Sequence, residues 1–393
     1  MPENNSLDIL NSIRSVAGDE YQARIPEAVR TNIASVGNTI LSYQPFTNKF
    51  FTELINRIGR VIVERMDSVD DIYSVFKDER LEFGDTVQRI FVDIPTAKAF
   101  EGSSTLNPAS MLSVEKGVIH VEYISVDRKL YYKRTISVAE LKEAFTTVAK
   151  LDEFIRAITE SMATALSYDK YIMTTETLYK ACAYALNLKE QATNASKVKV
   201  LSVPSTVAQY NKTTGEIEWD TVGAKVFLKM LRVASGMMKF PHEIVYASFD
   251  ASGDIEETEG LISAQKTKRS DQVLGLEVST LASIDVDALA TLFNLSKADL
   301  QTQVIEIEDG ALGLVTTSDQ EVEHYVGGFL CNKGAVERGT SFEDRDSFKN
   351  PEHEYVNMWQ HFWGYMAVSK FKDFVPIVFP IKASAESNES EGE

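Results

Sequence analysis

Apolar residues recur every three or four positions over residues 137–162, which is the spacing of one helix face. The stripe consists of Val138, Leu141, Phe145, Val148, Leu151, Ile155, Ile158 and Met162. Ser137 and Glu140 precede it in the spacing of a capping box, in which two side chains bind the first free backbone N–H groups. We expect one capped helix of about 25 residues, roughly 37 Å long, with more helix over 168–188. The rest of the fold should pack around it.

The segment before this helix, residues 67–136, has a different pattern. Three stretches of alternating or β-branched residues predict strands, at 86–94, 118–126 and 129–136. A turn-rich stretch, 101–108, separates the first two. A two-stranded ribbon alone is marginal in water, so it must fold back on its own body or dock on another chain. A long helix next to a ribbon that has no apolar core of its own predicts a subunit whose stability is completed by neighbouring subunits.

The flanking regions have clearer local patterns. Helical faces are predicted over 7–16, with Gly18 as a stop, over 28–41, and over 46–58, followed by a short strand at 61–63. Residues 196–354 alternate as a mixed α/β module. Its expected elements are a helix at 222–238, strands at 242–249, 273–278, 303–307 and 312–316, a polar surface loop at 250–271, and a capped helix at 286–293. Residues 355–379 are dense in aromatics and predict strands that return to the core.

Composition limits the function more than it identifies it. The 393 residues carry a net charge of −18 and are 44% apolar, which argues against wholesale disorder and allows two to three domains or one discontinuous unit. So acidic a chain repels phosphate, and we therefore expect no tight sequence-independent nucleic-acid binding. The acidic stretch 386–393 is expected to be disordered. We see no secretory signal and no apolar run long enough for a membrane span.

The search for catalytic or ligand-binding motifs finds none. The five histidines have no metal-ligand spacing, and no phosphate-binding glycine loop or nucleophile elbow is present. The acidic stretch 250–259 fails the EF-hand template, because Ile255 and Leu261 occupy the positions that need Gly and Glu. Cys182 and Cys331 are expected to be free, buried thiols in a reducing compartment, with a disulfide as the alternative. We therefore predict no catalytic, cofactor-binding or metal-binding residues.

Basic residues gather in only a few places. The runs are Arg128-Lys129, Lys133-Arg134 and Lys266-Thr267-Lys268-Arg269. They are interpreted as a solvated face. The alternative hypothesis is that the first two runs pair with carboxylates of an adjacent subunit, which would suit an acidic chain that must still self-associate.

Several segments, in order along most of the chain, resemble the major head protein family of phi29-like short-tailed phages. They are IRSVAGD (13–19), VGNTIL (36–41), RIGRVI (57–62), GDTVQRIFVDI (84–94), LKEAF (141–145), DVDALATLFN (285–294) and the last strands with VSKF (368–371). Of these, 285–294 is the most specific. The chain ends soon after Pro380, whereas the phi29 protein continues into an immunoglobulin-like domain, so no role of that appendage is carried over to this chain.

The resemblance implies an α+β fold of the Hong Kong 97 type. Its expected segments are an N-terminal arm and start of the peripheral domain (1–66), an extended β-ribbon loop (67–136), the peripheral domain with its spine helix (137–195), an axial α/β domain (196–354), returning strands of the peripheral domain (355–381) and a disordered tail (382–393). The same resemblance implies no catalytic residues, no cofactor and no enzymatic activity.

The function implied by the resemblance is that of a major capsid protein. Its copies would form pentamers and hexamers of an icosahedral head, a virion component assembled in the bacterial host cytoplasm around packaged double-stranded DNA. A separate scaffolding protein, a portal and head decoration proteins are the expected partners, with DNA in weak non-specific proximity and no membrane. The net acidity suggests an inner surface that leaves the duplex free to slide. The alternatives are a portal or tail component and an intracellular carboxylate-based hydrolase.

Overall fold

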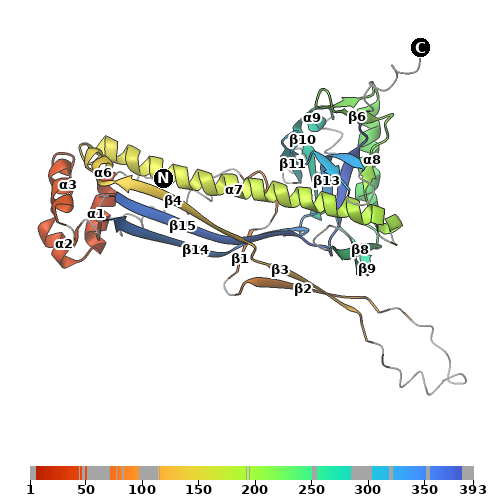
Figure 1. Cartoon of the computed structure of the whole chain (residues 1–393), viewed down its shortest axis with the longest axis horizontal. Helices are drawn as coiled ribbons and strands as arrows, with labels where there is room; N and C mark the ends of the chain where they lie inside the picture. Colours follow the sequence, from red (N-terminus) through yellow and green to blue (C-terminus); the bar gives the residue numbers. More distant parts are fainter. Residues whose placement is uncertain are drawn as a thin grey trace, which may run out of the picture.

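The computed structural model describes residues 6–43, 45–46, 49–50, 71–76, 78–81, 84–95, 97, 114, 116–191, 193, 195–249, 255–284, 303–317, 322–350 and 355–382. The molecule is elongated, with helices at one end, a compact α/β part at the other, and a thin ribbon that projects below (Figure 1). Most of the helix predicted over 46–58, the strand at 61–63 and the helix at 286–293 lie outside the described residues.

One helix, α7 (Val148–Gln191), runs along most of the molecule (Figure 1). The sequence predicts a single helix from Ser137, but the structure divides it into α6 (Val138–Ala144) and α7. The predicted capping box is present at the start of α6. The Glu140 amide donates to Ser137 Oγ at 3.1 Å, and the Ser137 amide donates to Glu140 Oε2 at 3.1 Å. The two predicted helical stretches of 137–162 and 168–188 are joined, because α7 continues without a break to Gln191.

The break between α6 and α7 has a local and a tertiary cause. The Lys150 amide donates to Thr147 Oγ1 at 3.3 Å, so Thr147 supplies a cap that starts a new helix. Phe145, just before it, is buried against the N-terminal helices. Its ring approaches Gly37 so closely that a Cβ there would lie 2.7 Å from it. Turning the chain at 145–147 therefore places Phe145 in a core that a straight helix would miss.

A four-stranded sheet, called here the long sheet, lies along the first half of α7 (Figure 1). Its strands, in spatial order, are β1 (Asp78–Arg80), β14 (Val336–Asn350), β15 (Tyr355–Val368) and β4 (Arg128–Ser137). Leu166 and Met173 of α7 pack on Phe362 of β15. Tyr132 of β4 donates a hydrogen bond to Asp169 of α7 at 2.7 Å. The predicted strand at 129–136 thus belongs to this sheet and not to the ribbon.

Three short helices close the far end of the long sheet. They are α1 (Ser6–Val16), α2 (Asp19–Arg24) and α3 (Ile33–Ser42). Gly18 has φ +92°, a left-handed conformation that suits glycine and ends α1 as predicted. The helix predicted over 28–41 begins later, at Ile33, and α2 was not predicted. Their apolar faces pack on Ile136, Phe145 and Met358.

The second half of α7 covers one face of a second sheet, called here the six-stranded sheet. Its strands are β11 (Val304–Ile307), β10 (Gln272–Glu277), β13 (Glu323–Asn332), β16 (Phe374–Phe379), β5 (Leu201–Ser202) and β12 (Leu314–Thr316), which pairs with β13. Neighbouring residues of β10 point to opposite faces, as in any strand. Val273 packs in the core between the sheet and α7, and Leu274 packs in the core between the sheet and α8 (Gly223–Met237).

Smaller elements surround this sheet. They are the hairpins β6 (Ala208–Asn211)–β7 (Glu216–Trp219) and β8 (His242–Phe249)–β9 (Ile255–Gln265), the helix α9 (Val278–Ala282), and the 3₁₀ turns η1 (Ala195–Lys197) and η2 (Arg269–Asp271). The predicted surface loop over 250–271 is wrong, because β9 is a strand paired with β8. Its glutamates disfavour a strand locally, and pairing with β8 overrides that preference.

The ribbon consists of β2 (Thr86–Val92) and β3 (Ile119–Ser125), which lie within the strands predicted at 86–94 and 118–126 and pair in antiparallel register. Three strands pair with a sheet outside the segment to which the sequence analysis assigns them. β4 leaves the ribbon for the long sheet, β14 leaves the expected axial segment for the long sheet, and β16 leaves the expected peripheral segment for the six-stranded sheet. The reason is that the chain crosses between the two sheets at residues 332–336 and 368–374, where no composition change marks the crossing.

The capping box gives a direct stability test. Ser137→Ala removes the oxygen that accepts the Glu140 amide, and we expect a loss of about 1 kcal/mol in the free energy of unfolding, measured by chemical denaturation. Ser35→Ala, at an exposed position inside α3, is the matched control and should have little effect. Equal losses in both variants would mean that the cap contributes nothing.

Glu277 gives a pH-dependent test. Its side chain is 1% exposed, and Oε1 accepts hydrogen bonds from Tyr325 Oη at 2.7 Å and the Gly310 amide at 2.9 Å. Burial raises the pKa of this carboxyl above its ordinary value, so folding favours the protonated form. The contribution of this carboxyl to the free energy of unfolding is therefore complete at low pH and is lost as the pH rises through the raised pKa. The loss is about 1.4 kcal/mol for each unit by which folding raises the pKa.

Glu277→Gln keeps an acceptor but carries no charge. We expect its free energy of unfolding to increase steadily, relative to that of the unmodified protein, from acid to neutral pH. The exposed Glu306→Gln on the neighbouring strand should run parallel to the unmodified protein. A Glu277→Gln difference that is constant with pH would contradict the expected linkage.

Candidate assembly surfaces

The histidines, considered above as possible metal ligands, take structural roles. Three histidines pair with carboxylates from distant segments: His120 with Asp93 (3.2 Å), His242 with Asp373 (2.5 Å) and His324 with Glu190 (3.0 Å). His361 packs beside Tyr131, with ring centroids 6.1 Å apart, and His353 lies outside the described residues. Across the described ranges, no group of three or more His, Cys, Asp or Glu side chains is arranged to hold a metal ion.

Both cysteines are free and buried, as predicted. Cys182 of α7 and Cys331 of β13 lie in the same apolar core. Burial raises the pKa of both thiols, which keeps them protonated and unreactive at neutral pH. Among the helices that the structure describes, none carries a stretch apolar enough to cross a bilayer.

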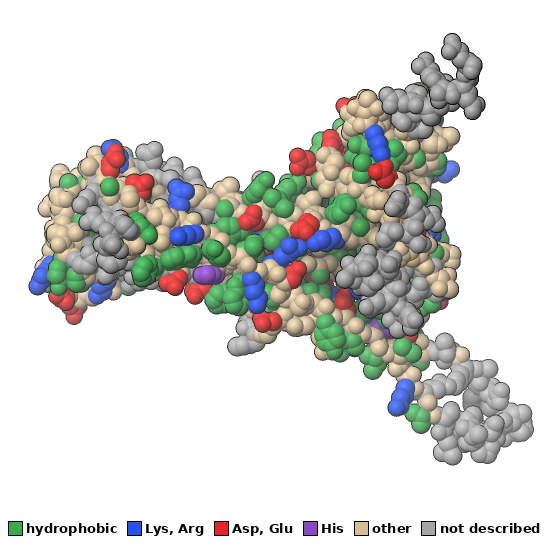
Figure 2. Space-filling model, in the orientation of Figure 1, with side chains coloured by type: hydrophobic (Ala, Val, Ile, Leu, Met, Phe, Trp, Pro, Cys, Tyr) green, Lys and Arg blue, Asp and Glu red, His purple; other side chains and the backbone are tan. Residues whose placement is uncertain are grey.

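The ribbon has two chemically different faces. Along β2 and β3, half-buried and exposed side chains alternate, because successive residues point to opposite faces. The exposed face is apolar over several registers, where Ile90 opposes Val121 and Val92 opposes Ile119. Ile90 is 60% exposed and Ile119 61%. We call these four residues the apolar ribbon face; green side chains are visible along the projecting ribbon in Figure 2.

The opposite face of the ribbon binds the body through polar contacts. His120 is 7% exposed, and its Nδ1 lies 2.7 Å from Tyr246 Oη of β8. Its Nε2 lies 3.2 Å from Asp93 Oδ2, and Asp93 also accepts a bond from Ser263 of β9 at 3.4 Å. These contacts fasten the outer part of the ribbon to the β8–β9 hairpin.

Two further contacts fix the direction in which the ribbon leaves the body. Glu122 accepts hydrogen bonds from Ser369 Oγ at 2.8 Å and from the Lys370 amide at 2.9 Å. Arg89 forms an ion pair with Glu337 of β14. The ribbon therefore has a fixed orientation without burying its apolar face against its own chain.

Lys129 and Lys133 lie on the face of the long sheet that points away from α7, whereas Arg128 points toward α7 and pairs with its Glu176 at 3.5 Å. Lys129 Nζ lies 4.7 Å from the ring centroid of Trp363, and Lys133 Nζ lies 5.6 Å from that of Trp359. These are cation–π distances between directly opposed residues of β4 and β15. Figure 2 shows apolar side chains interleaved with charged ones along the elongated middle of the molecule. The third run lies at η2, beside the six-stranded sheet.

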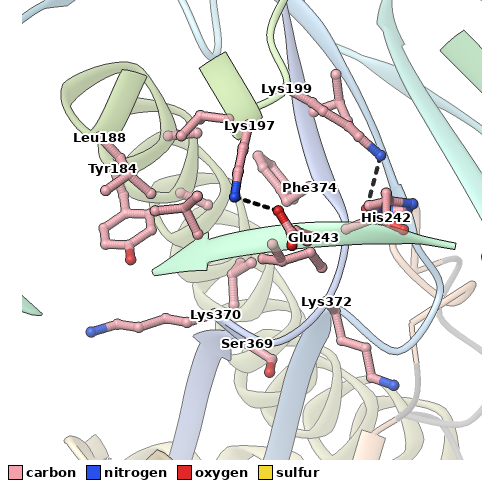
Figure 3. A pocket seen from close by; sticks show the side chains of 18 of the residues that line it. Tyr184, Leu188, Lys197, Lys199, His242, Glu243, Ser369, Lys370, Lys372 and Phe374 are labelled. Atoms are coloured by element: carbon pink, nitrogen blue, oxygen red, sulfur yellow. Dashed lines mark hydrogen bonds and ion pairs between the residues drawn. The ribbon is translucent and has the colours of Figure 1, made fainter. Parts of the chain in front are cut away.

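A pocket of about 300 Å³ lies between the C-terminal part of α7, strand β8 and the segment that joins β15 to β16 (Figure 3). Its floor is apolar and includes Ala185, Leu188 and Val245. Five lysines line it: Lys180, Lys197, Lys199, Lys370 and Lys372. Lys197 pairs with Glu243, and Lys199 Nζ lies 3.9 Å from Asp373.

Sequence reasoning missed this pocket and the contacts of His120. The contacts of His120 join residues that are 27 and 126 positions apart, and the pocket lining extends from Thr177 to Val375. None of these segments carries a local motif. The apolar ribbon face could have been found from the alternation of β2 and β3 alone. The orientation of that face toward solvent depends on contacts that only the fold provides.

Comparison with known proteins places the chain among phage head proteins. The family model for phi29-like phage major capsid proteins matches residues 10–378. The major capsid protein of Bacillus phage B103 is 24% identical over 375 residues, covering 95% of this chain and 73% of that protein. The major capsid protein of Streptococcus phage Cp-1 is 33% identical over 169 residues, covering 42% of this chain and 45% of that protein.

Among solved structures, one described as the capsid structure of Staphylococcus phage Andhra is similar to this chain. The TM-score is 0.52 at 12% identity, over 77% of this chain and 82% of that one. At 12% identity, this similarity is evidence for the fold alone. It matches the expected Hong Kong 97-type α+β architecture.

The contact between His120 and Tyr246 provides a test of how the ribbon is held. Tyr246→Phe leaves a buried ring nitrogen of His120 without its hydroxyl partner, at a local cost of about 1–3 kcal/mol. We expect faster amide hydrogen exchange in β3, with β10 unchanged. Tyr131→Phe removes a hydroxyl from a side chain that is 65% exposed and is the control. Unchanged exchange in β3 would show that other contacts hold the ribbon.

Proposed function

The chain belongs to the phi29-like phage major capsid protein family and is a shell-forming protein of a phage head; from this premise we propose how its surfaces join the copies. Each ribbon lies across an adjacent copy and buries the apolar ribbon face there. The copies assemble as pentamers and hexamers that close into an icosahedral shell. A portal or tail component is set aside by the family match along most of the chain.

The observation that carries this proposal is the exposure of the apolar ribbon face. A two-stranded ribbon gains little stability by itself, and exposed strands with apolar side chains invite association. Ile90, Val92, Ile119 and Val121 are each more than one third exposed in the isolated chain. A neighbouring copy would remove them from water, at about 25 cal/mol for each Å² of apolar surface that it covers.

The two sheets would have different places in a capsomer. We propose that the six-stranded sheet with α8 forms the axial part, near the capsomer centre. The long sheet, α7 and the N-terminal helices would form the peripheral part. In residue ranges, the axial part would comprise 196–335 and 369–382, and the peripheral part would include 128–191 and 336–368. Because α7 packs on both sheets, each copy would enter the shell as one rigid unit.

The basic runs add a second proposed contact. Lys133 and Arg134 would approach carboxylates of an adjacent copy, which would offset part of the repulsion between chains of net charge −18. Lys133 already lies over Trp359 within its own chain. A bound carboxylate would therefore complete a site that is partly formed.

Other expected partners belong to the same proposal. A separate scaffolding protein, a portal and head decoration proteins would assemble with the chain in the bacterial cytoplasm. Packaged DNA would lie near it without tight binding, since the acidic chain repels phosphate. The family is one of structural proteins, and we propose that the chain has no catalytic activity. The hydrolase alternative would require a carboxylate pair set for acid–base catalysis.

The apolar ribbon face can be tested by assembly. The double substitution Ile90→Asp and Val121→Asp puts two charges on directly opposed residues of this face. We expect folded chains that no longer form shells, as seen by electron microscopy and sedimentation velocity, because burying two unpaired carboxylates costs several kcal/mol.

The matched control is Thr86→Asp with Ser125→Asp. These residues are also directly opposed and exposed on the same side of the ribbon, but they are polar and lie at its base. This variant should assemble with a modest loss. Normal shells from the Ile90→Asp/Val121→Asp variant would refute the proposed role of the face.

A further inference from the structure

The pocket between α7 and β8 combines three features that suit one kind of ligand (Figure 3). It has a cationic lining, an apolar floor and an open strand edge. We propose that it binds an extended, acidic peptide segment with one bulky apolar side chain, and that the segment belongs to a protein other than this chain. The inference goes beyond shell formation and does not depend on it.

The charge of the pocket is opposite to that of the chain. Five lysines and two carboxylates line it, an excess of three positive charges, whereas the whole chain carries −18. Both carboxylates are already engaged. Glu243 pairs with Lys197, while Asp373 lies 2.5 Å from His242 and accepts a hydrogen bond from Thr267 at 2.6 Å. Lys180 is also engaged, with Glu176 of α7 at 2.7 Å, so the cations that would meet an incoming anion are Lys199, Lys370 and Lys372.

Lys199 supports an anionic occupant independently. Its Nζ is buried and has no hydrogen-bond partner among the described residues, and Oδ1 of Asp373 is 3.9 Å away. A buried ammonium without an acceptor is costly. At the pocket mouth, Lys370 and Lys372 extend from the segment that joins β15 to β16 (Figure 3). Carboxylates on a bound segment would meet these side chains.

The floor calls for an apolar side chain as well as charge. Ala181, Ala185 and Leu188 of α7 line the pocket together with Val245 of β8, which packs with Leu188, and Phe374 adds a ring. A cavity of about 300 Å³ is at the lower end of the size range of small-ligand pockets. It accommodates one large aliphatic or aromatic side chain.

The third feature is the free edge of β8. Among the described strands, β8 pairs with β9 alone, and none of them pairs with its other edge. Glu243, Ile244 and Val245 on this strand line the pocket. An extended peptide can add to such an edge as a further strand, with backbone bonds for affinity and side-chain pockets for specificity. This geometry favours a peptide over a compact amphiphile.

The acidic runs of this chain do not fit the pocket. Residues 386–393 contain only Glu, Ser, Asn and Gly and offer nothing to fill the floor. Residues 250–259 connect β8 to β9 and continue into β9, where Ile255 is paired with Phe249. With these two runs excluded, we assign the occupant to a different protein, and a second copy of the chain is the outcome that the self-association measurement below tests.

The test uses the purified full-length chain and a fluorescent synthetic peptide with a central leucine flanked by glutamates. We expect saturable binding by fluorescence anisotropy, weakening as salt is added. Replacing the leucine by glycine, or the glutamates by lysines, should weaken binding at least about tenfold. Absence of saturable binding, or equal binding of the glycine peptide, overturns the proposal.

The pocket variant is Lys370→Glu with Lys372→Glu, and we expect it to weaken peptide binding at least about tenfold. The matched control is Lys225→Glu with Lys229→Glu, which makes the same charge change at exposed positions of α8 outside the pocket. Equal losses in both variants would reduce the binding to overall charge and overturn the proposal. Loss of self-association without peptide, in the pocket variant alone, would make a second copy the occupant and also overturn it.

A measurement on the unmodified chain removes dependence on the variants. Addition of the leucine peptide should slow amide hydrogen exchange in residues 243–245 of β8, because a new strand would pair with that edge. The ribbon strand β2, which does not line the pocket, should exchange as before. Binding without new protection at 243–245 would place the peptide elsewhere and overturn the proposal.

Discussion

The packing of α7 on two sheets is the contact on which the rest of the structure depends. Its middle part packs on β15 through Leu166 and Met173, and its C-terminal part packs on the six-stranded sheet through Leu178 and Cys182. Polar residues within the helix do not interrupt it. The hydroxyls of Thr174 and Thr177 donate to carbonyls four residues earlier. Because one rigid element belongs to both cores, the two sheets keep a fixed mutual arrangement.

That arrangement determines how the ribbon is presented. The ribbon leaves the body beside β14 and is fastened by polar contacts to the β8–β9 hairpin and to the loop before β16, so elements next to both sheets hold it. Polar contacts fix its direction while leaving apolar Ile90 and Val121 exposed. The face that carries these contacts points to the body, so the opposite face keeps the apolar surface that a neighbouring copy is proposed to cover.

Local signals made some elements predictable. The capping box of Ser137 and Glu140 was readable because its partners are three residues apart. The strands of the ribbon were readable from their alternation, and Gly18 was readable as a helix stop. The break at residues 145–147 was missed because its cause is the burial of Phe145 against Gly37, a contact across about a hundred residues of chain. Strand β9 was missed because its glutamates disfavour a strand until β8 pairs with it.

The sequence by itself determined the main helix, the ribbon and the family resemblance, because periodicity, caps and ordered motifs are properties of short segments. Only the tertiary structure decided which sheet each strand joins, which face of the ribbon meets water, and that lysines from three separate elements surround one apolar pocket. The physical reason is that these outcomes depend on side chains far apart in the chain. Their encounter is set by the packing of α7 and not by any local preference.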